Sequence, residues 1–271
     1  MPELPEVEVC KLGILPHIKG QQVDDVVVRF WQLRWPIPED VLTLKGHKVL
    51  DVQRRSKYLM LIFDTGTLLI HLGMSGAIRV ISNDVAPIKH DHFDLVFKNK
   101  KVLRLNDPRR FGAVLWLPEH QDIDGVLAKL GPEPLSDEFN VDYLIEKAKG
   151  RKTPIKNFLM NNPVVVGVGN IYANEALFLS GILPTTHAGD ISKRRLSILV
   201  DTIKAVLAAA ITQGGTTLKD FTQADGKPGY FAQSLNVYGR GGEPCLVCDT
   251  ELTEIRQSNR SSVYCKKCQK K

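Results

Sequence analysis

The stretch KYLMLIF at residues 57–63 is apolar on both of the faces that a β-strand presents. Successive side chains of a strand point to opposite faces. A strand that is buried on both faces needs either a second packed sheet or a cover of helices. One face carries Leu59, Leu61 and Phe63, and the other carries Tyr58, Met60 and Ile62. The stretch therefore predicts layered β structure in this part of the chain.

Seven more stretches of β character surround it between residues 21 and 117. Each is short and rich in branched or aromatic residues, and turn formers such as those at 64–67 separate them. In chain order they are VVVRF, KVLDVQ, TLLIHL, AIRVI, FDLVF, KVLRL and AVLWL. The first half of the chain is thus predicted to be mainly β.

The segment before these strands, which opens MPELPEVEV, has the pattern of an amphipathic helix. Pro5 suits the first helical position, where its missing N–H costs nothing. Apolar side chains then recur with helical spacing at Val7, Cys10, Ile14 and Ile18. Cys10 lies on this apolar stripe, so we expect a buried free thiol there.

The helix pattern does not explain Pro2 and Glu3. A small residue at position 2 permits removal of the initiator methionine, and this would leave Pro2 as a terminal secondary amine. An unperturbed terminal amine has a pKa of ~7.7–8, whereas lysine has a pKa of ~10.4. Such an amine would hold far more of the neutral, nucleophilic form at neutral pH.

The second half of the chain changes character after LGPEPLSDEF at 130–139, which we interpret as a linker because of its prolines and glycine. Helical patterns follow at 141–149, 170–181 and 192–215. The polar, glycine-bearing segment near 217–230 is predicted to be a mobile loop. The predicted boundaries are 1–132, 133–236 and 237–271.

The end of the chain carries two Cys-x-x-Cys pairs, Cys245 with Cys248 and Cys265 with Cys268, separated by sixteen residues. This spacing predicts one structural Zn²⁺ held by four thiolates, with a hairpin between the two pairs. Two disulfides are the alternative, but they do not suit an intracellular chain. Arg260 should lie near the tip of the hairpin, either as a solvated turn residue or as a phosphate contact.

The balance of charge favours a polyanionic partner. The 271 residues carry a formal net charge of +6. The stretch 146–156 has five basic residues and one acidic residue, and we interpret it as a loop that faces phosphate. No apolar run reaches membrane-spanning length, and no secretory signal pattern precedes the first helix, so an intracellular protein without a membrane partner is expected.

Two glycine-flanked or turn-flanked stretches offer side chains that can enter a base stack. Met74 lies between glycines in LGMSG, and Arg109 and Phe111 follow a turn-forming Asp-Pro in NDPRRFG. A core methionine and a salt-bridged turn are the simpler interpretations. By themselves these stretches favour the simpler ones, although methionine and phenylalanine wedges between base steps are known in proteins.

Three other polar positions stay open on the sequence alone. Asn170 follows two glycines, where it can cap a helix or help to bind a phosphate. Lys57 starts the central strand and can be merely solubilising. His90 and His92 lack a nearby third metal ligand, so a solvated turn or a phosphate contact is expected.

These pieces together resemble the formamidopyrimidine-DNA glycosylase family over essentially the whole chain. The matching stretches are MPELPEVE, QRRSKYLML, HLGMSG, KHDHFD, DPRRFG, LGPEPL, VVGVGNIYANE, QGGTTLKDF, GKPGYFAQ, LNVYGRGGEPC and the two cysteine pairs. EVCKL after the opening is a departure that affects only the first helix. The resemblance implies an α+β protein: an N-terminal β-sandwich flanked by helices, then a helix–two-turns–helix domain with a C-terminal zinc-finger hairpin.

The resemblance also implies an activity and residue roles. Pro2 would be the nucleophile in excising oxidised purines such as 8-oxoguanine from damaged duplex DNA, followed by β,δ-elimination. Glu3 would donate a proton, and Lys57 and Arg260 would assist elimination. Met74, Arg109 and Phe111 would fill the space that the extruded nucleotide leaves in the duplex. The loop near 217–230 would close over the extruded base. The residues implied to bind phosphates are Lys57, His90, Arg109, Arg151, Asn170 and Arg260.

Two rival functions remain on the sequence. One is an endonuclease VIII-like glycosylase for oxidised pyrimidines, and the other is a zinc-finger DNA-binding protein without catalysis. Met74, Arg109 and Phe111 and the glycine-rich loop favour the oxidised-purine enzyme. We expect a cytoplasmic monomer that associates with the nucleoid through DNA, with no organic cofactor.

Overall fold

The structure is a computed structural model that describes residues 2–119, 125, 127–215 and 235–271. Its residues fall into two units. Unit 1 takes in Met1–Ala128 and Gln213–Ala232, and unit 2 takes in Lys129–Thr212 and Gln233–Lys271. No helix in the described ranges is long and apolar enough to cross a membrane.

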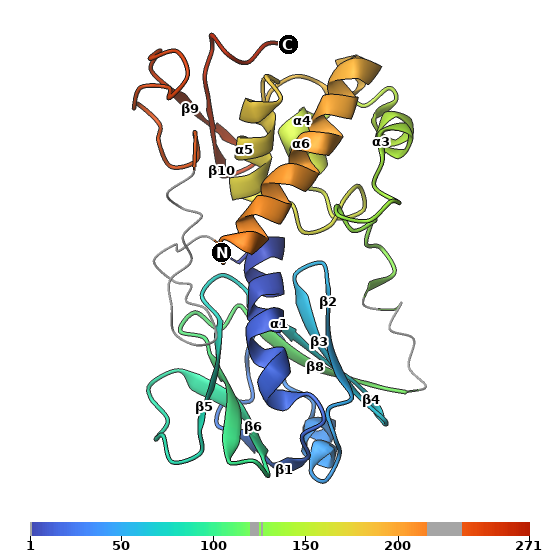
Figure 1. Ribbon diagram of the computed structural model, residues 1–271, viewed down its shortest axis with the longest axis vertical. Coiled ribbons are helices and arrows are strands. Elements are labelled where there is room, and N and C mark those ends of the chain that lie inside the picture. The colour runs from blue at the N-terminus through green and yellow to red at the C-terminus, as the bar shows by residue number, and fades with distance from the viewer. Residues whose placement is uncertain (1, 120–124, 126, 216–234) are drawn as a thin grey trace. The chain divides into compact units, whose positions relative to one another are not determined.

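Unit 1 contains two four-stranded antiparallel sheets (Figure 1). The first has the order β1 (Val23–Val28), β6 (Asp91–Phe97), β7 (Lys101–Asn106) and β5 (Ala77–Ser82). The second has the order β2 (Asp51–Arg55), β3 (Tyr58–Phe63), β4 (Gly66–His71) and β8 (Ala113–Pro118). Each of the eight stretches predicted to be β overlaps one of these strands.

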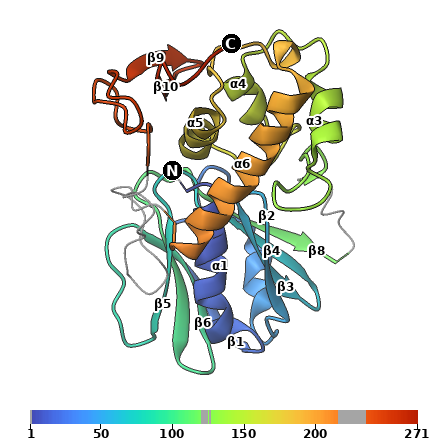
Figure 2. The same cartoon turned by 45° about the horizontal axis from the view of Figure 1, so that its top comes forward.

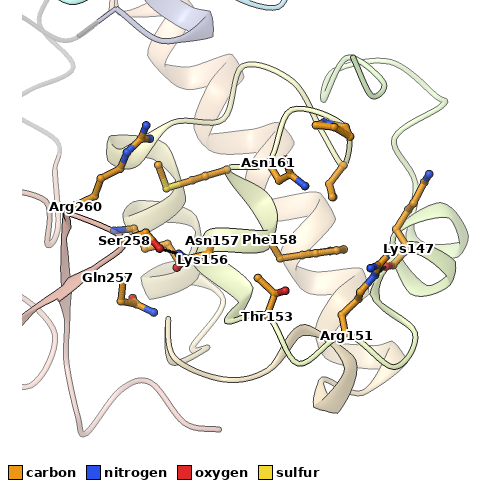
Figure 3. Close-up of a pocket in the computed structure, with 13 residues that line it drawn as sticks. Lys147, Arg151, Thr153, Lys156, Asn157, Phe158, Asn161, Gln257, Ser258 and Arg260 are labelled. Carbon is orange, nitrogen blue, oxygen red and sulfur yellow. Dashed lines mark hydrogen bonds between the residues drawn. The ribbon is translucent and has the colours of Figure 1, made fainter. Parts of the chain in front are cut away.

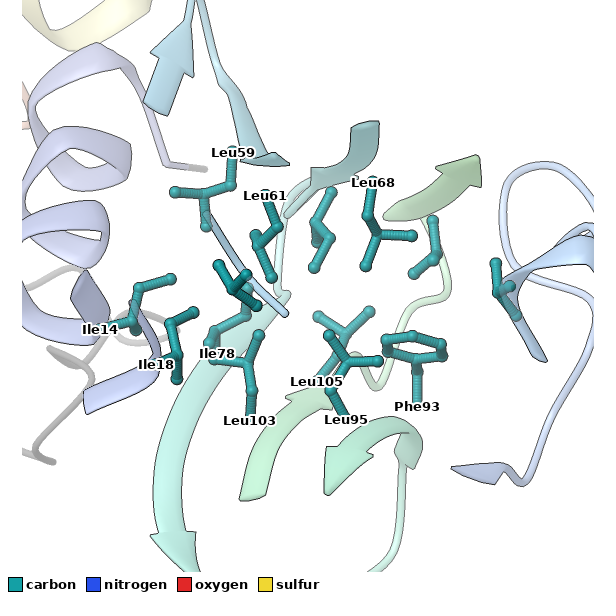
Figure 4. Packing of buried hydrophobic residues seen from close by; sticks show 14 of the residues in the cluster. Ile14, Ile18, Leu59, Leu61, Leu68, Ile78, Phe93, Leu95, Leu103 and Leu105 are labelled. Carbon is teal, nitrogen blue, oxygen red and sulfur yellow. The ribbon is translucent and has the colours of Figure 1, made fainter. Parts of the chain in front are cut away.

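The core of unit 1 lies between the two sheets (Figure 4). Leu59 and Leu61 of β3 face Leu103 and Leu105 of β7 across this layer, and all four are at most 2% exposed. The other face of β3 is buried at Met60 and only half-buried at Tyr58 and Ile62. The prediction of layered β structure from KYLMLIF is confirmed, and the second sheet is the layer that covers it.

Helix α1 (Leu4–Ile18) closes one side of this core and contacts strands of both sheets. Val7, Cys10, Ile14 and Ile18 are all buried, as their spacing predicts. Burial raises the pKa of the Cys10 thiol to about 12, so this residue is an inert core thiol. The helix begins at Leu4, one residue earlier than predicted, and a short 3₁₀ helix, η1 (Glu39–Leu44), lies further along unit 1.

Unit 2 combines helices with a two-stranded hairpin. Its elements are α3 (Val141–Ala148), α4 (Ile155–Leu159), α5 (Asn170–Leu179), η2 (Ala188–Asp190), α6 (Lys193–Thr212), β9 (Thr253–Gln257) and β10 (Arg260–Tyr264). Helix α5 packs against α6 on one side and against β10 on another (Figure 2). The hairpin therefore rests on a helical layer, and the α+β class predicted from the sequence is confirmed.

Candidate functional site

The amino terminus of the chain is held in place by the first turn of α1. Pro2 is buried and Glu3 is 2% exposed. The Glu3 N–H donates to Glu6 Oε2 at 2.8 Å, and the two glutamates form a capping box. The fold thus fixes a buried carboxylate directly beside Pro2.

The chain returns to this place much later in the sequence. Gly215 has φ +79°, and a side chain there would lie 3.3 Å from the Glu6 side chain. The positive φ favours glycine, and a side chain there would also require Glu6 to move by a few tenths of an ångström. The predicted loop near 217–230 begins just after this point, but it lies outside the described residues.

Strand register brings several predicted site residues to one end of the β layers of unit 1. His71 pairs with both Tyr58 and Ala113, and Asn106 pairs with both Ala77 and Asp91. Register aligns these strand ends within each sheet, and the hydrogen bond from Ser75 Oγ to the Asp107 carboxylate joins the segments that follow them in the two sheets. The segments at these strand ends carry Lys57, Met74, His90, Arg109 and Phe111.

Lys57 follows the tight turn between β2 and β3. Ser56 has φ +56° and is buried, and its carbonyl accepts a hydrogen bond from Arg54 Nη1 at 2.9 Å. Arg54 Nε also donates to Glu8 Oε2 of α1 at 2.7 Å. This ion pair ties the Lys57 turn to the helix that begins beside Pro2 and Glu3.

His71, at the end of β4, lies among positive charges. Its pKa is lowered to about 4, first by burial and then by the charges of Lys57 and Arg34, with Asp107 opposing. Its Nδ1 accepts a hydrogen bond from the Gly73 N–H at 3.0 Å, so that nitrogen carries no proton. The ring is therefore neutral at physiological pH and keeps Nε2 as a donor.

Met74, Arg109 and Phe111 form one surface cluster. Arg109 Nη2 donates to Met74 Sδ at 3.2 Å, and the Arg109 guanidinium carbon lies 5.2 Å from the centre of the Phe111 ring. Met74 is 36% exposed and Phe111 is 47% exposed, so neither is a core side chain. A loop-borne cluster of this kind presents two apolar groups and one cation to solvent.

Asp107 fastens the two loops that carry this cluster, although it is fully buried. Its carboxylate accepts hydrogen bonds from Ser75 Oγ at 2.8 Å and from the Gly112 N–H at 2.7 Å. The Arg109 N–H in turn donates to Ser75 Oγ at 3.3 Å. These hydrogen bonds hold the two loops together. The exposed side chains of Met74, Arg109 and Phe111 are therefore kept at a fixed distance from one another.

His90 and His92 have different environments. His92 is buried and its Nε2 donates to the Asp107 carbonyl at 2.9 Å. His90 has φ +73°, and its carbonyl accepts from the Asp107 N–H at 3.0 Å. Within the described ranges neither histidine belongs to a metal-binding group. Because His92 is buried in strand β6, the solvated turn expected for it is wrong.

Unit 2 contains a basic cavity of about 510 Å³ between α3, α4 and the hairpin turn. Its cationic lining is Lys147, Arg151, Lys156 and Arg260, and none of the described residues that line it is acidic. In Figure 3, Arg260 lies on one side of this cavity and Lys147 and Arg151 lie on the other. The cavity therefore joins two of the residues that the sequence singled out, Arg151 and Arg260.

Arg260 is the first residue of β10 and is exposed. It follows a two-residue turn in which Ser258 and Asn259 both have positive φ, the geometry of a type I′ hairpin. Behind it, the buried Lys156 Nζ donates to Ser262 Oγ at 2.6 Å and to the Ser261 carbonyl at 2.5 Å. This buried ammonium fixes the strand that presents Arg260.

Asn170 is the first residue of α5, and the residue that caps this helix is Gly169. Its side-chain oxygen is buried and has no hydrogen-bond partner among the described residues. The alternative that Asn170 is the N-cap is therefore wrong. The N-terminus of α5 still presents backbone N–H groups of the type that binds phosphate.

The four cysteines come together as predicted. Their Sγ atoms all lie within 4.8 Å of one another, and none of them is in a disulfide. Tetrahedral zinc with Zn–S bonds of about 2.3 Å requires sulfurs about 3.8 Å apart. The Sγ of Cys245 lies 3.9 Å from that of Cys268, and the Sγ of Cys248 lies 3.4 Å from that of Cys265. The residues fit one structural Zn²⁺ with no open coordination position.

The zinc module is joined to the helices by buried polar groups. The Glu175 carboxylate of α5 accepts hydrogen bonds at 2.8–2.9 Å from the backbone N–H groups of Asn236, Val237 and Tyr238 and from the Asn236 amide. Asn174 Oδ1 accepts from the Val263 N–H at 2.9 Å. A helix thus holds both the entry to the module and its hairpin.

Sequence reasoning missed His71, Asp107 and Glu175, which these contacts bring forward. Lys147 and Lys156 fell within the basic stretch 146–156, but the sequence did not single them out individually. His71 ends a predicted strand beside LGMSG, and Asp107 lies within NDPRRFG, so both stood next to stretches already singled out. The roles of Lys156 and Glu175 depend on partners more than 60 residues away, so no local pattern marks them.

Family models match three parts of the chain. "Formamidopyrimidine-DNA glycosylase N-terminal domain" matches residues 1–114, "Formamidopyrimidine-DNA glycosylase H2TH domain" matches 130–222, and "Zinc finger found in FPG and IleRS" matches 242–271. A formamidopyrimidine-DNA glycosylase of Colwellia psychrerythraea is 69% identical over 269 residues, which are 99% of this chain and 99% of that protein.

Solved structures of one further relative, the Lactococcus lactis FPG, are also similar at 31% identity. A G226P mutant with Fapy-dG DNA has a TM-score of 0.93 and covers 100% of both chains. The complex with abasic-site DNA has a TM-score of 0.92 and covers 99% of this chain and 100% of that one. The wild-type protein with DNA containing an oxidised pyrimidine also has a TM-score of 0.92, with 100% of both chains covered.

Proposed function

Because this chain belongs to the formamidopyrimidine-DNA glycosylase family, and is a base-excision repair glycosylase with abasic-site lyase activity, we propose that Pro2 is its nucleophile once Met1 has been removed. It removes oxidised purines from duplex DNA and then cleaves the strand at the abasic site. The two rival functions are not favoured, since the family models and relatives are those of formamidopyrimidine-DNA glycosylases.

The observation that carries this assignment is the buried Glu3 carboxylate, fixed by the first turn of α1 immediately beside Pro2. The lone pair of the Pro2 amine forms a bond to C1′ of the damaged nucleotide, and the bond from C1′ to the base breaks. The base leaves with the electron pair, and the proton that it takes up balances the one that the Pro2 nitrogen loses. The bond from C1′ to the ring oxygen then breaks as the iminium forms. Glu3 is placed to protonate the ring oxygen of the sugar as the ring opens.

The product of this step is an iminium ion between Pro2 and the sugar. A secondary amine gives an iminium nitrogen that has no proton to lose, so the cation remains an electron sink. It acidifies C2′, which loses a proton as the 3′ phosphate departs. A second elimination then expels the 5′ phosphate. We propose that Lys57 and Arg260 assist these eliminations, as cations beside the departing phosphates.

Extrusion of the damaged nucleotide comes first, because C1′ is inaccessible in a stacked duplex. We assign the vacated space to the surface cluster of Met74, Arg109 and Phe111. Its exposed apolar side chains and the spacing fixed by Asp107 support this assignment. The loop near 217–230 is proposed to close over the extruded base.

Phosphate binding is assigned to cations and polar groups in each unit. Unit 1 would contribute Lys57, His90 and Arg109. Unit 2 would contribute Arg151 and Arg260 from its basic cavity, and Asn170 at the start of α5. The structural zinc supplies rigidity to the hairpin that carries Arg260, whereas the chain's own residues do the chemistry.

The organisation proposed for the working enzyme has three parts: a catalytic β-sandwich at 1–132, a helix–two-turns–helix DNA-binding domain at 133–236 and a zinc finger at 237–271. We propose that one copy of the chain acts alone on DNA, in the cytoplasm and in association with the nucleoid. Damaged duplex DNA is its partner, as it is in the Lactococcus lactis complexes.

Borohydride trapping tests the assignment of the nucleophile. Reduction converts the iminium to a stable amine, so native enzyme should become cross-linked to a duplex that contains 8-oxoguanine. A variant with an uncleavable extension before Pro2 should bind the duplex but form no cross-link. Pro2→Ala is a weaker control, because it still leaves a terminal amine. Equal cross-linking by the extended and native forms would show that the nucleophile is another group.

A further inference from the structure

A second cavity, of about 720 Å³, lies in unit 1, and the mechanism above assigns no ligand to it. Three segments line it, at 32–34, 71–74 and 109–111. Two of these segments carry the surface cluster of Met74, Arg109 and Phe111. The third belongs to the loop between β1 and η1, which neither the sequence nor the mechanism has assigned to a function.

This loop is folded firmly against its neighbours. The Arg34 N–H donates to the Gly112 carbonyl at 3.1 Å, and the Ile37 N–H donates to the Trp31 carbonyl at 2.8 Å. Leu33 and Ile37 are buried in the core of unit 1. The loop is therefore joined directly to the segment that presents Arg109 and Phe111, and it keeps a fixed position beside them.

Two large aromatic side chains of this loop are left exposed. Trp31 is 40% exposed and Trp35 is 41% exposed, whereas the third tryptophan of the chain, Trp116, is 8% exposed. Neither tryptophan lines the cavity itself, but each is next in sequence to a residue that does, Gln32 for Trp31 and Arg34 for Trp35. Tryptophan is enriched where a protein binds a partner.

Three arginines line the cavity, and the guanidinium group of each lies over an aromatic ring. The guanidinium carbon of Arg34 lies 4.7 Å from the centre of the Trp35 ring, and that of Arg110 lies 5.0 Å from the Phe30 ring. Arg109 over Phe111 is the third pair. Within the part of the chain that the structure describes, no aspartate or glutamate lines the cavity.

The exposed tryptophan rings can stack on an aromatic base, and the arginines can bind an anionic phosphate. Together these groups suit a nucleotide. Insertion of a wedge into a duplex opens a base step, so a nucleotide beside the gap loses one of its stacking neighbours. The cavity directly adjoins the proposed wedge, so such a nucleotide is the occupant that lies within reach.

We propose that Trp31, Arg34 and Trp35 form a second nucleotide-binding platform, which takes a nucleotide of the bound DNA left partly unstacked by the insertion of Met74, Arg109 and Phe111. The inference rests on the proposed function, because it requires the wedge to enter DNA. It extends the DNA contact of unit 1 beyond the wedge and gives the loop between β1 and η1 a role in lesion recognition.

Equilibrium binding of the zinc-loaded enzyme, at one fixed salt concentration, tests the platform. The probes are a duplex with a non-cleavable abasic analogue and the same duplex without damage. Trp35→Ala and Arg34→Gln should each weaken binding to the abasic duplex by about tenfold, and should change binding to the undamaged duplex much less. Leu42→Ala, which alters an exposed apolar residue of η1, is the matched control and should bind like the wild type.

Fluorescence gives a second readout that does not depend on those variants. In Trp31→Phe and Trp35→Phe the one remaining exposed tryptophan should be quenched by the abasic duplex more strongly than by the undamaged duplex. In a further pair of duplexes, the fluorescent base 2-aminopurine lies beside the abasic position in one strand or in the other. The strand whose 2-aminopurine fluorescence differs between the wild-type complex and the Trp35→Ala complex contains the bound nucleotide. A difference on either strand supports the platform, and no difference on both strands overturns it.

Failure of this inference can be distinguished from failure of the proposed function. If the platform is absent, wild type and all variants bind the abasic duplex equally, while borohydride still traps the native enzyme. If the proposed function is wrong, the native enzyme itself forms no cross-link.

Discussion

At the scale of single residues, Asp107 shows how a buried group can determine what exposed groups do. It touches no solvent, yet its carboxylate joins the loop of Met74 to the loop of Arg109 and Phe111. The two backbones also meet closely, since a side chain at Gly73 would lie 2.4 Å from the Phe111 carbonyl carbon. Loss of the Asp107 hydrogen bonds, or of the close packing at Gly73, should move Met74, Arg109 and Phe111 apart although all three side chains are still present.

Asp107→Asn tests this positioning role. The asparagine amide has one oxygen acceptor, so it cannot accept from both Ser75 Oγ and the Gly112 N–H, and the link between the two loops is weakened. We expect excision of 8-oxoguanine to slow by about 10- to 100-fold, the cost of a displacement on the order of 1 Å near a reacting group. Asp24→Asn, at an exposed carboxylate of β1, is the control, and single-turnover kinetics is the measurement. Wild-type rates in Asp107→Asn would contradict the role.

His71 gives a prediction about pH. Its pKa is lowered to about 4 in the folded chain, below its usual value of about 6.5. Between these values the unfolded chain binds more protons, so the free energy of unfolding falls as the pH drops from 6.5 to 4. The loss due to His71 should be on the order of 3 kcal/mol.

Denaturant unfolding at several pH values checks this. His71→Asn keeps an acceptor for the Gly73 N–H but cannot titrate, so its free energy of unfolding should fall less steeply in this range. Parallel curves for the wild type and the variant would show that His71 keeps an ordinary pKa.

At the scale of elements, the strands of unit 1 follow from local pattern because each is short, apolar and bounded by turn residues. The helices α3, α5 and α6 of unit 2 are predicted with ends that agree within a few residues, whereas α4 (Ile155–Leu159) is not predicted. The stretch 146–156, interpreted as a loop, in fact ends α3 and begins α4, and only its middle is a loop. The register of the strands cannot be predicted from the sequence. Register nevertheless helps to determine that Lys57, Met74 and Arg109 lie at the same end of the β layers of unit 1. The Trp31–Trp35 loop escaped notice for the same reason, since its partners come from segments far along the chain.

Helix α5 makes a second testable contribution through Glu175. Its buried carboxylate accepts four hydrogen bonds from N–H groups of residues 236–238, where the chain enters the zinc module. Glu175→Gln should destabilise unit 2 by about 2–3 kcal/mol, because an amide cannot accept all four bonds and hydrogen bonds to charged groups are the stronger kind.

The control for Glu175→Gln is Glu243→Gln. Glu243 forms an exposed ion pair with Arg240 at 2.8 Å, and such pairs contribute about 0–1 kcal/mol. Thermal unfolding of the zinc-loaded proteins should separate the two variants clearly. Equal effects would mean that the carboxylate does not hold the module.

At the scale of the whole molecule, the chain assigns different tasks to its two units. Unit 1 carries Pro2, Glu3 and the surface cluster, on a core built from two sheets and α1. Unit 2 carries the basic cavity and the zinc module, whose small core of Phe178, Val237, Leu252 and Val263 includes two of the cysteines. A core this small needs the metal to be stable.

Loss of zinc should therefore affect DNA binding before it affects the fold of unit 1. Cys268→Ser should retain little zinc, and its hairpin should no longer present Arg260, so trapping on lesion DNA should be largely lost. Cys10→Ala, at the cysteine outside the cluster, should keep one zinc per chain. Native mass spectrometry measures the metal, and a metal-free Cys268→Ser that traps normally would contradict this role.

The central claim is that the free amine of Pro2 becomes bonded to deoxyribose. Mass spectrometry of peptides from the borohydride cross-link tests it most directly. The account predicts that the adduct lies on a peptide that begins with Pro2 and lacks Met1. An adduct on Lys57 or another lysine, or active enzyme that retains Met1, would contradict it.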